Sequence, residues 1–256
     1  MELKLHNAIN LHCLCGNPDG NILNFIPDDA QPEWSRILDG HLQSFDLKSE
    51  MPSRYAKACE NAAQSDGLKK YFSFITEKSG IIIDLASGPS GYFAPALDIL
   101  KDDGLFIAAD GSRAVLEAHA AMNKENAQFM AACIDLDKPL PFLDDSIDTM
   151  CGNLLNNVEG YKNLIAEIYR CLKPGGRFAV IDLFYEKESQ TYAYLLERNV
   201  VYSSLDYYIS FCRNIGFDFL GSELLNTIKG KIDKQDLLPI GDNDTAEMRT
   251  LYFEKN

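Results

Sequence analysis

The chain has 256 residues, 46% of them hydrophobic, and a formal net charge of −14 at pH 7. This length and composition suffice for the buried core of one α/β domain with an appendage. A surface this acidic repels phosphate backbones, so it disfavours nucleic acid as a partner and favours a small molecule or a peptide. The chain contains no run of about 18 apolar residues, which disfavours a membrane span, and its start lacks the apolar centre of a signal peptide. We therefore expect a soluble, cytoplasmic protein.

The cysteine pattern agrees with that location. Seven cysteines are present, an odd number, and most of them stand singly in apolar segments. Free, buried thiols in a reducing compartment explain this pattern better than a disulfide framework does.

Before residue 78 the chain has a mixed pattern. The segments "LHCLC" and "NILNF" flank "GNPDG", and a Pro-Asp-Gly turn between two such segments predicts a hairpin. Two or three helices follow, at about 31–41, 51–64 and 67–77. We interpret 1–77 as an N-terminal cap on a second unit, 78–256.

After residue 78 strands and helices alternate. The first strand, 80–86, is a continuous apolar run, as expected for a strand covered on both faces. Further strands are predicted at 104–110, 127–135, 147–153, 177–185, 217–224 and 249–255. Helices are predicted at about 93–101, 112–122, 159–172 and 204–214. Such alternation folds as a parallel sheet wrapped by helices, and ligands bind beyond the carboxyl ends of its strands.

The segment "DLASGPSG", 84–91, leaves the first of these strands and turns at once into a helix. Gly88 and Gly91 permit positive φ or a close approach of the backbone to a ligand, and N–H groups at the helix start would face that ligand. Asp110 ends the next strand about twenty residues later, where an acid accepts hydrogen bonds from ribose hydroxyls. The loop by itself also suits a nicotinamide or flavin cofactor, or a tight turn with no ligand.

Four segments in register give a more specific indication. They are "DLASGPSG", "AADGS", "IDLDKPLPFLDDSIDTM" and "EIYRCLKPGGRFAVID". In this order and at these strand positions they resemble the class I S-adenosylmethionine-dependent methyltransferases, over about 78–185. The resemblance implies an α/β, Rossmann-like fold with a seven-stranded, mostly parallel sheet, an antiparallel last strand and helices on both faces. The N-terminal cap, with a short hairpin and helices, would be added to that fold.

The resemblance also implies roles for residues at matching positions, with S-adenosyl-L-methionine as the cofactor. Asp84 would steady the loop and the amino-acid end of the cofactor. Gly88 and Gly91 would let the backbone approach the cofactor. Asp110 would bind the ribose hydroxyls, with Gly111 beside it.

Further along the chain, Asp135 would meet the adenine amino group, with Leu136 beside the ring. Asn153 would line the methionine portion. The sequence departs from the family pattern at two places, because Ala86 stands at the usual first glycine and Ser90 at a later one. Both residues are small, so we expect Ala86 to keep its contact with the cofactor after a slight backbone adjustment.

The acceptor side is less defined. Methyl transfer from a sulfonium is an in-line displacement of an activated donor, so alignment and exclusion of water suffice unless the acceptor holds a proton of high pKa. We consider Asp182, Tyr185 and Asn157 as catalytic candidates, because they lie at or after the ends of the fourth and fifth strands. Each has an alternative role: Asp182 in capping a turn, Asn157 in a turn or helix cap, and Tyr185 in packing.

The cap is expected to define the acceptor pocket rather than to bind the cofactor. Arg54 and Tyr55 lie in a helical stretch that would either close on the cofactor or form a surface helix. The aromatic-rich segment 185–208 would line an apolar pocket or belong to the core. The "LHCLC" segment faintly resembles the zinc ribbon that precedes some methyltransferases, but it offers one Cys-x-Cys pair where two pairs are needed, so we predict no bound metal.

These observations predict an S-adenosylmethionine-dependent methyltransferase that acts on a small molecule or a peptide-like metabolite. An RNA methyltransferase with a degenerate N-terminal ribbon is the second enzyme hypothesis, and the acidic charge disfavours it. A non-catalytic cofactor-binding module of the same fold is a third. A nicotinamide oxidoreductase is disfavoured by the "KPGG" turn and by the missing third-glycine spacing.

Overall fold

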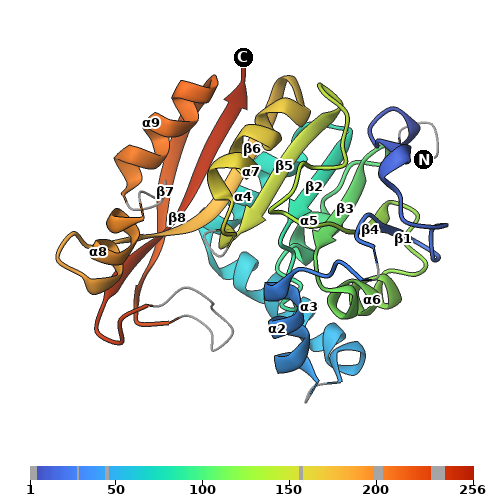
Figure 1. The fold of residues 1–256 in the computed structure, drawn as a ribbon, viewed down its shortest axis with the longest axis horizontal. Helices are drawn as coiled ribbons and strands as arrows, with labels where there is room; N and C mark the ends of the chain where they lie inside the picture. Colours follow the sequence, from blue (N-terminus) through green and yellow to red (C-terminus); the bar gives the residue numbers. More distant parts are fainter. Residues whose placement is uncertain (1–4, 28, 44–45, 156–157, 199–203, 232–239) are drawn as a thin grey trace.

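The computed structural model describes the chain apart from residues 1–4, 28, 44–45, 156–157, 199–203 and 232–239. Its described residues form one sheet covered by helices on both faces (Figure 1). The strands are β1 (Ile22–Asn24), β2 (Ile81–Leu85), β3 (Leu105–Asp110), β4 (Phe129–Cys133), β5 (Ile147–Asn153), β6 (Leu172–Tyr185), β7 (Phe217–Lys229) and β8 (Thr245–Lys255). The helices are the short 3-10 helix η1 (Leu11–Cys13), α2 (Glu33–Leu42), α3 (Leu47–Gln64), α4 (Asp66–Thr76), α5 (Ala94–Asp98), α6 (Arg113–Met122), α7 (Tyr161–Cys171), α8 (Gln190–Glu197) and α9 (Leu205–Ile215).

The strand order across the sheet is β1-β4-β3-β2-β5-β6-β8-β7. The first six strands of that order run parallel to their neighbours, and β8 runs antiparallel to both β6 and β7. The predicted mostly parallel, Rossmann-like sheet with helices on both faces is confirmed. The described residues add one strand to the seven expected, and that strand is β1.

The strand β1 comes from the segment that the sequence predicted as a hairpin. Residues 11–13 form η1 instead of a strand. The predicted hairpin is reduced to an antiparallel bridge between Asp19 and Ile22 and a hydrogen bond from the N–H of Cys15 to the carbonyl of Asn24, and 22–24 pair in parallel with β4. Ile22 and Leu23 are only 6% and 5% exposed. An isolated two-stranded hairpin would leave one face of such residues in water, whereas the edge of the sheet buries Ile22 against one helical layer and Leu23 against the other.

The two faces of the sheet are covered by different helices. Side chains of α3, α4, α5 and α6 pack with Ile82 on one face. Side chains of α7 and α9 pack with Ile81 and Ile83 on the other. Because both faces of the sheet are buried at β2, this strand is apolar apart from Asp84, the residue before its last.

Two helices differ from their predicted bounds or were not predicted. Helix α3 begins at Leu47 rather than near 51, because Asp46 caps it by accepting a hydrogen bond from the backbone N–H of Ser49. Helix α8 forms within the aromatic-rich segment and is capped in the same way by Ser189. Among the helices of the described residues, none has the length and apolar character needed to cross a membrane.

Candidate functional site

The loop that follows β2 contains three residues in the left-handed region. Ala86, Gly88 and Gly91 have φ values of 53°, 58° and 65°. Ala86 therefore takes the conformation that the usual glycine would take, at the cost of backbone strain, and no rearrangement of the loop is needed. Leu154, which follows the neighbouring strand β5, is also left-handed with φ 56°. Strained non-glycine residues gather at functional sites, so these two mark the carboxyl ends of β2 and β5.

Both backbone polar groups of Gly88 are hydrogen-bonded to side chains. Its N–H donates to Asp110 Oδ2 at 2.9 Å, and its carbonyl lies 2.8 Å from Nε2 of His119. The other oxygen of Asp110 accepts from the N–H of Ser112 at 2.8 Å. Burial raises the pKa of Asp110 to about 6, against which these backbone hydrogen bonds act. The predicted ribose-binding acid thus lies directly against the glycine loop.

Asp84 is the residue before the last of β2 and is 7% exposed. Burial raises the pKa of its carboxyl to about 7. The thiol of Cys151, on β5, lies 3.6 Å from Oδ1 of Asp84. The carboxyl therefore lies between β2 and β5, just before the loop whose conformation it was predicted to stabilise.

The N-terminal helices reach this loop directly (Figure 1). The ring of Tyr55, on α3, packs so closely on Gly91 that a β-carbon there would lie 2.5 Å from Cδ1. Arg54, also on α3, donates to the carbonyl of Pro89 at 3.2 Å. From α2, Ser35 donates to the carbonyl of Gly111 at 2.6 Å. The cap therefore contacts the cofactor-side loops, whereas the sequence predicted that it would act mainly on the acceptor.

A pocket of about 270 Å³ opens beside the end of β4. Its walls include Phe25 and Ile26 on one side and Ile134, Asp135 and Pro141 on the other. The lining is mainly apolar, with Asp135 and Lys138 as its charged residues. The role of Asp135 toward an adenine amino group stays a prediction.

Leu136 does not line this pocket. Its side chain is 1% exposed and packs in the core on the α7 side of the sheet. The side chain of Leu136 therefore does not reach this pocket, whereas Phe25 and Ile26 line it. Little in the sequence indicates a role for these two residues, because "NILNF" has the composition of a hairpin arm. They reach the pocket because β1 continues its pairing with β4, through a hydrogen bond of 2.9 Å from the N–H of Phe25 to the carbonyl of Cys133.

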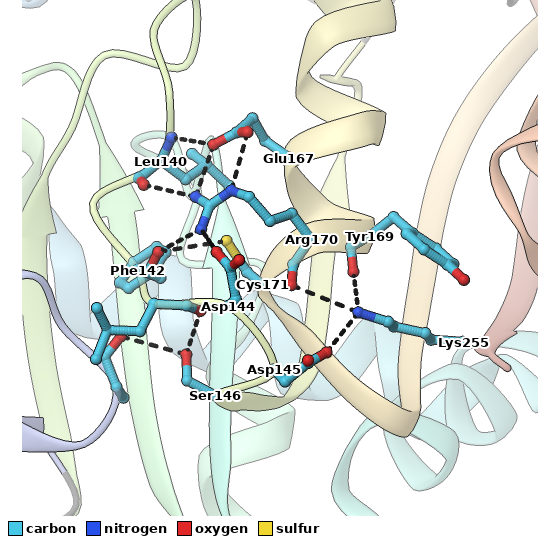
Figure 2. Close-up of polar contacts among 12 residues, drawn as sticks. Leu140, Phe142, Asp144, Asp145, Ser146, Glu167, Tyr169, Arg170, Cys171 and Lys255 are labelled. Atoms are coloured by element: carbon cyan, nitrogen blue, oxygen red, sulfur yellow. Dashed lines mark hydrogen bonds and ion pairs between the residues drawn. The ribbon is translucent and has the colours of Figure 1, made fainter.

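The loop between β4 and β5 is fixed by Arg170, near the end of α7, whose guanidinium lies among residues of the loop (Figure 2). Its guanidinium donates to the carboxylates of Glu167 and Asp144 and to the carbonyls of Leu140 and Phe142, at 2.6–3.0 Å. Glu167 in turn accepts from the N–H of Leu140 at 2.8 Å. These bonds satisfy all five guanidinium N–H groups and hold the loop that carries one wall of the pocket.

Asn153 lies at the end of β5, beside the strained Leu154. Its Oδ1 is buried and has no hydrogen-bond partner among the described residues. A buried acceptor of this kind is costly unless a donor reaches it. The ammonium group of a methionine portion is such a donor, so the residues present fit S-adenosylmethionine at the position that the sequence predicted.

Two of the three catalytic candidates, Asp182 and Tyr185, are buried in the core. Asp182 is fully buried and accepts from the hydroxyl of Tyr161 at 2.8 Å, and that hydroxyl lies 2.8 Å from the hydroxyl of Tyr208. This carboxylate belongs to the core between the sheet and α7 and α9, so its predicted contact with an acceptor is wrong and the structural alternative holds. Tyr185 is 5% exposed and packs in the same core. Asn157 lies outside the described residues.

The cysteines do not assemble a metal site within the part of the chain that the structure describes. Cys13 is exposed and Cys15 is half-buried, and both thiols are free. No group of three or more His, Cys, Asp or Glu side chains able to hold a metal lies together among these residues.

The site also contains residues that the sequence did not single out. His119 and Asn123, on and just after α6, are buried and connect the glycine loop to Tyr55. Neither belongs to a recognisable motif. The only signal available was a histidine on the apolar face of a predicted helix, which more often indicates a core residue than a site.

Comparisons with known proteins agree with this geometry. Residues 83–180 match a family model described as a methyltransferase domain. A relative from Desulfotalea psychrophila (strain LSv54 / DSM 12343), named ubiquinone/menaquinone biosynthesis C-methyltransferase UbiE, is 33% identical over 105 residues, which are 41% of this chain and 42% of the relative. The matched part therefore spans about two fifths of that relative's length.

Among solved structures, a geranyl diphosphate methyltransferase in complex with SAM superposes with a TM-score of 0.57 at 12% identity, covering 97% of this chain and 96% of that one. The cyclase SpnF superposes with a TM-score of 0.54 at 16% identity, covering 73% of this chain and 79% of its own. Identities this low establish the fold alone. Together with the family match, they show that residues 83–180 are similar to a methyltransferase domain and that the chain shares its fold with these structures.

Proposed function

We propose that the protein transfers a methyl group from S-adenosylmethionine to a small molecule. The observation that carries this proposal is the convergence of the loop 86–91, the carboxylate of Asp110 and the buried oxygen of Asn153 at the carboxyl ends of adjacent strands. A glycine-type loop alone is common. Here the loop is flanked by the buried oxygen of Asn153, which can accept from an ammonium group, and by Asp110, which can accept from ribose hydroxyls. This combination suits a nucleoside joined to an amino acid.

Each part of the cofactor has residues that suit it. Asp110 would accept from the ribose hydroxyls, and the pocket at Asp135 and Phe25 would hold the adenine. Asn153 would accept from the ammonium group, and Asp84 would favour the same positive charge. Burial raises the pKa of Asp84 to about 7, and a nearby cation would stabilise the charged form of this carboxyl.

When bound, S-adenosylmethionine supplies a methyl group already activated by its sulfonium. The residues of the chain then need to orient the acceptor and exclude water. The helices α2 and α3 cover the loops that follow β2 and β3, and this cover excludes solvent from one side of the site. We therefore assign 1–77 to a cap that completes the site.

Two observations favour a small acceptor over RNA. The formal net charge of −14 opposes a polyanion. Two of the similar proteins are named for small-molecule substrates. One is the ubiquinone/menaquinone C-methyltransferase relative, and the other is the geranyl diphosphate methyltransferase neighbour. By that analogy we propose an apolar metabolite with a nucleophilic carbon as the first acceptor class to test.

Calorimetry with S-adenosylmethionine, S-adenosylhomocysteine and NAD tests the cofactor. We expect both sulfur compounds to bind and NAD not to bind. Asp110→Asn should weaken binding by roughly 1–3 kcal/mol, because it removes a charged hydrogen-bond acceptor. Asp102→Asn, at an exposed position, is the matched control and should bind as the parent does. Binding of NAD in place of the sulfur compounds would refute the assignment.

Transfer from S-adenosylmethionine labelled in its methyl group tests the reaction. After incubation with a cell extract, the label should appear in the small-molecule fraction. Label in the RNA fraction would support the RNA methyltransferase instead. Tight cofactor binding with no labelled product in any fraction would support the non-catalytic module.

A further inference from the structure

His119 has a defined protonation at both ring nitrogens. The ring is fully buried, with Nε2 2.8 Å from the carbonyl of Gly88 and Nδ1 3.0 Å from the hydroxyl of Tyr55. A carbonyl can only accept, so the proton must be on Nε2, and Nδ1 must accept from the tyrosine hydroxyl. Burial lowers the pKa of His119 to about 4, which keeps the ring neutral near pH 7.

The donors form a chain in one direction. The side-chain amide of Asn123 donates to the Tyr55 hydroxyl at 2.8 Å and to the carbonyl of His119 at 2.9 Å. The hydroxyl donates to His119, and His119 donates to Gly88. The N–H of Gly88 then donates to Asp110. The peptide units on both sides of Gly88 are thereby fixed. Asp110 accepts from the N–H of Gly88, and His119, which is held by Tyr55 on α3, donates to its carbonyl.

The ring of Tyr55 adds a steric constraint to the same loop. It is 8% exposed and packs on Gly91, with its centroid 5.6 Å from that of Phe93. The adjacent Arg54 donates to the carbonyl of Pro89 and is held by Glu50 at 2.8 Å. Helix α3 therefore contacts the loop directly at residues 89 and 91, and it reaches residue 88 only through His119 on α6.

We propose that Tyr55, His119 and Asn123 are positioning residues for the cofactor loop, so that α3 is part of the cofactor site as well as part of the cap. This inference rests on the proposed function, because it assigns those residues a role in S-adenosylmethionine binding. The network fixes the carbonyl of Gly88 on His119 and thereby favours one conformation of the loop. Without the network, the loop would have to be ordered when the ligand binds, and the affinity would fall.

The variant Tyr55→Phe tests the network, because it removes the hydroxyl and keeps the ring on Gly91. Calorimetry with S-adenosylhomocysteine should show a loss of affinity on the order of tenfold, the effect of one buried hydrogen bond. Tyr92→Phe, which removes a hydroxyl next to the same loop but outside the chain of donors, is the matched control and should bind as the parent does. His119→Gln keeps a donor for Gly88 and should lose less affinity than His119→Ala.

The double variant Tyr55→Phe/His119→Ala separates a network from general destabilisation. Because the hydroxyl acts through the histidine, the double variant should bind as His119→Ala does, not with the product of the two losses. Nitrogen-15 spectra should place the His119 proton on Nε2 in the parent and show a changed Nδ1 shift in Tyr55→Phe. If His119→Ala fails to fold, His119→Gln replaces it in the cycle.

The outcomes distinguish this inference from the proposed function. A parent protein that binds no S-adenosylhomocysteine refutes the proposed function and this inference together. A parent that binds while Tyr55→Phe binds equally well refutes this inference alone. Additive losses in the double variant would also refute it.

Discussion

The ring of Tyr55 occupies the space that a side chain at Gly91 would need. A β-carbon at Gly91 would lie 2.5 Å from Cδ1 and 2.6 Å from Cε1 of that ring. Real β-carbon contacts are not this short, and the ring is held in place by its hydroxyl. The glycine in this loop is therefore required by an N-terminal helix, in addition to any requirement of a ligand.

We predict that Gly91→Ala costs about 2–4 kcal/mol of unfolding free energy, since it combines a left-handed backbone with a clash. Gly88→Ala is the matched control, because φ is +58° there and the nearest atom, the carbonyl oxygen of Ala86, is 3.8 Å from the added carbon. It should cost about 1–2 kcal/mol, the backbone term alone. Urea unfolding measures both, and equal losses would show that the ring moves freely.

Ala86→Gly should stabilise the protein. The left-handed conformation costs an alanine about 1–2 kcal/mol, and glycine removes that strain while adding about 0.5–1 kcal/mol of unfolded-state entropy. The net gain is expected to be about 0.5–1 kcal/mol in urea unfolding. Ala56→Gly, at an exposed position inside α3, should lose about 1 kcal/mol. If both variants lost unfolding free energy, the result would contradict backbone strain at Ala86.

The stability of the parent relative to Asp84→Asn should depend on pH. Burial raises the pKa of Asp84 from 3.8 to about 7, so the folded state binds a proton between these values that the unfolded state releases. The contribution of this group is thus fully present below pH 3.8 and is lost as the pH rises to about 7. We expect the parent to lose on the order of 3–4 kcal/mol relative to Asp84→Asn between pH 4 and pH 8. A difference that is constant over this range, in urea titrations, would contradict the burial of the carboxyl.

Tyr161→Phe should destabilise the fold and leave the cofactor affinity within a few-fold of the parent. It removes a donor from the buried carboxylate of Asp182, which costs roughly 1–3 kcal/mol. Tyr192→Phe, on the half-buried surface of α8, should change stability by less than about 0.5 kcal/mol. A large loss of turnover in Tyr161→Phe without a loss of stability would return Asp182 to the catalytic candidates.

Arg170→Lys should cost about 2 kcal/mol, because a lysine keeps the charge but cannot make the five directed hydrogen bonds to the loop. In Arg170→Lys, hydrogen exchange at the amide of Leu140, which donates to Glu167, should become faster. Arg113→Lys is the control: its side chain is 44% exposed and pairs with surface acids, so little change is expected. Unchanged exchange at Leu140 in Arg170→Lys would show that Glu167 holds the loop alone.

The sequence determined the features that depend on neighbouring residues. The apolar run 81–85, which contains Asp84 and is followed by small residues, indicates a buried strand that leaves the sheet in a turn, and Asp110 ends the next strand. Parallel strands place their carboxyl ends at one edge, so the order of motifs along the chain already assembled Asp84, Asp110 and Asn153.

Only the tertiary structure decided which partners surround those residues. The hydroxyl of Tyr55 meets His119 across 64 positions of sequence, and His119 meets Gly88 across 31, so no local pattern encodes either contact. Residues 22–24 had the composition of a hairpin arm, but the edge of β4 buried their apolar side chains on both faces and a hairpin would not. Asp182 was expected at a strand end, but β6 continues for three residues beyond it, and the tyrosine that hydrogen-bonds to its carboxylate lies in a separate element, α7. Local chemistry fixes which groups a segment offers, and burial, which depends on the whole fold, decides what they contact.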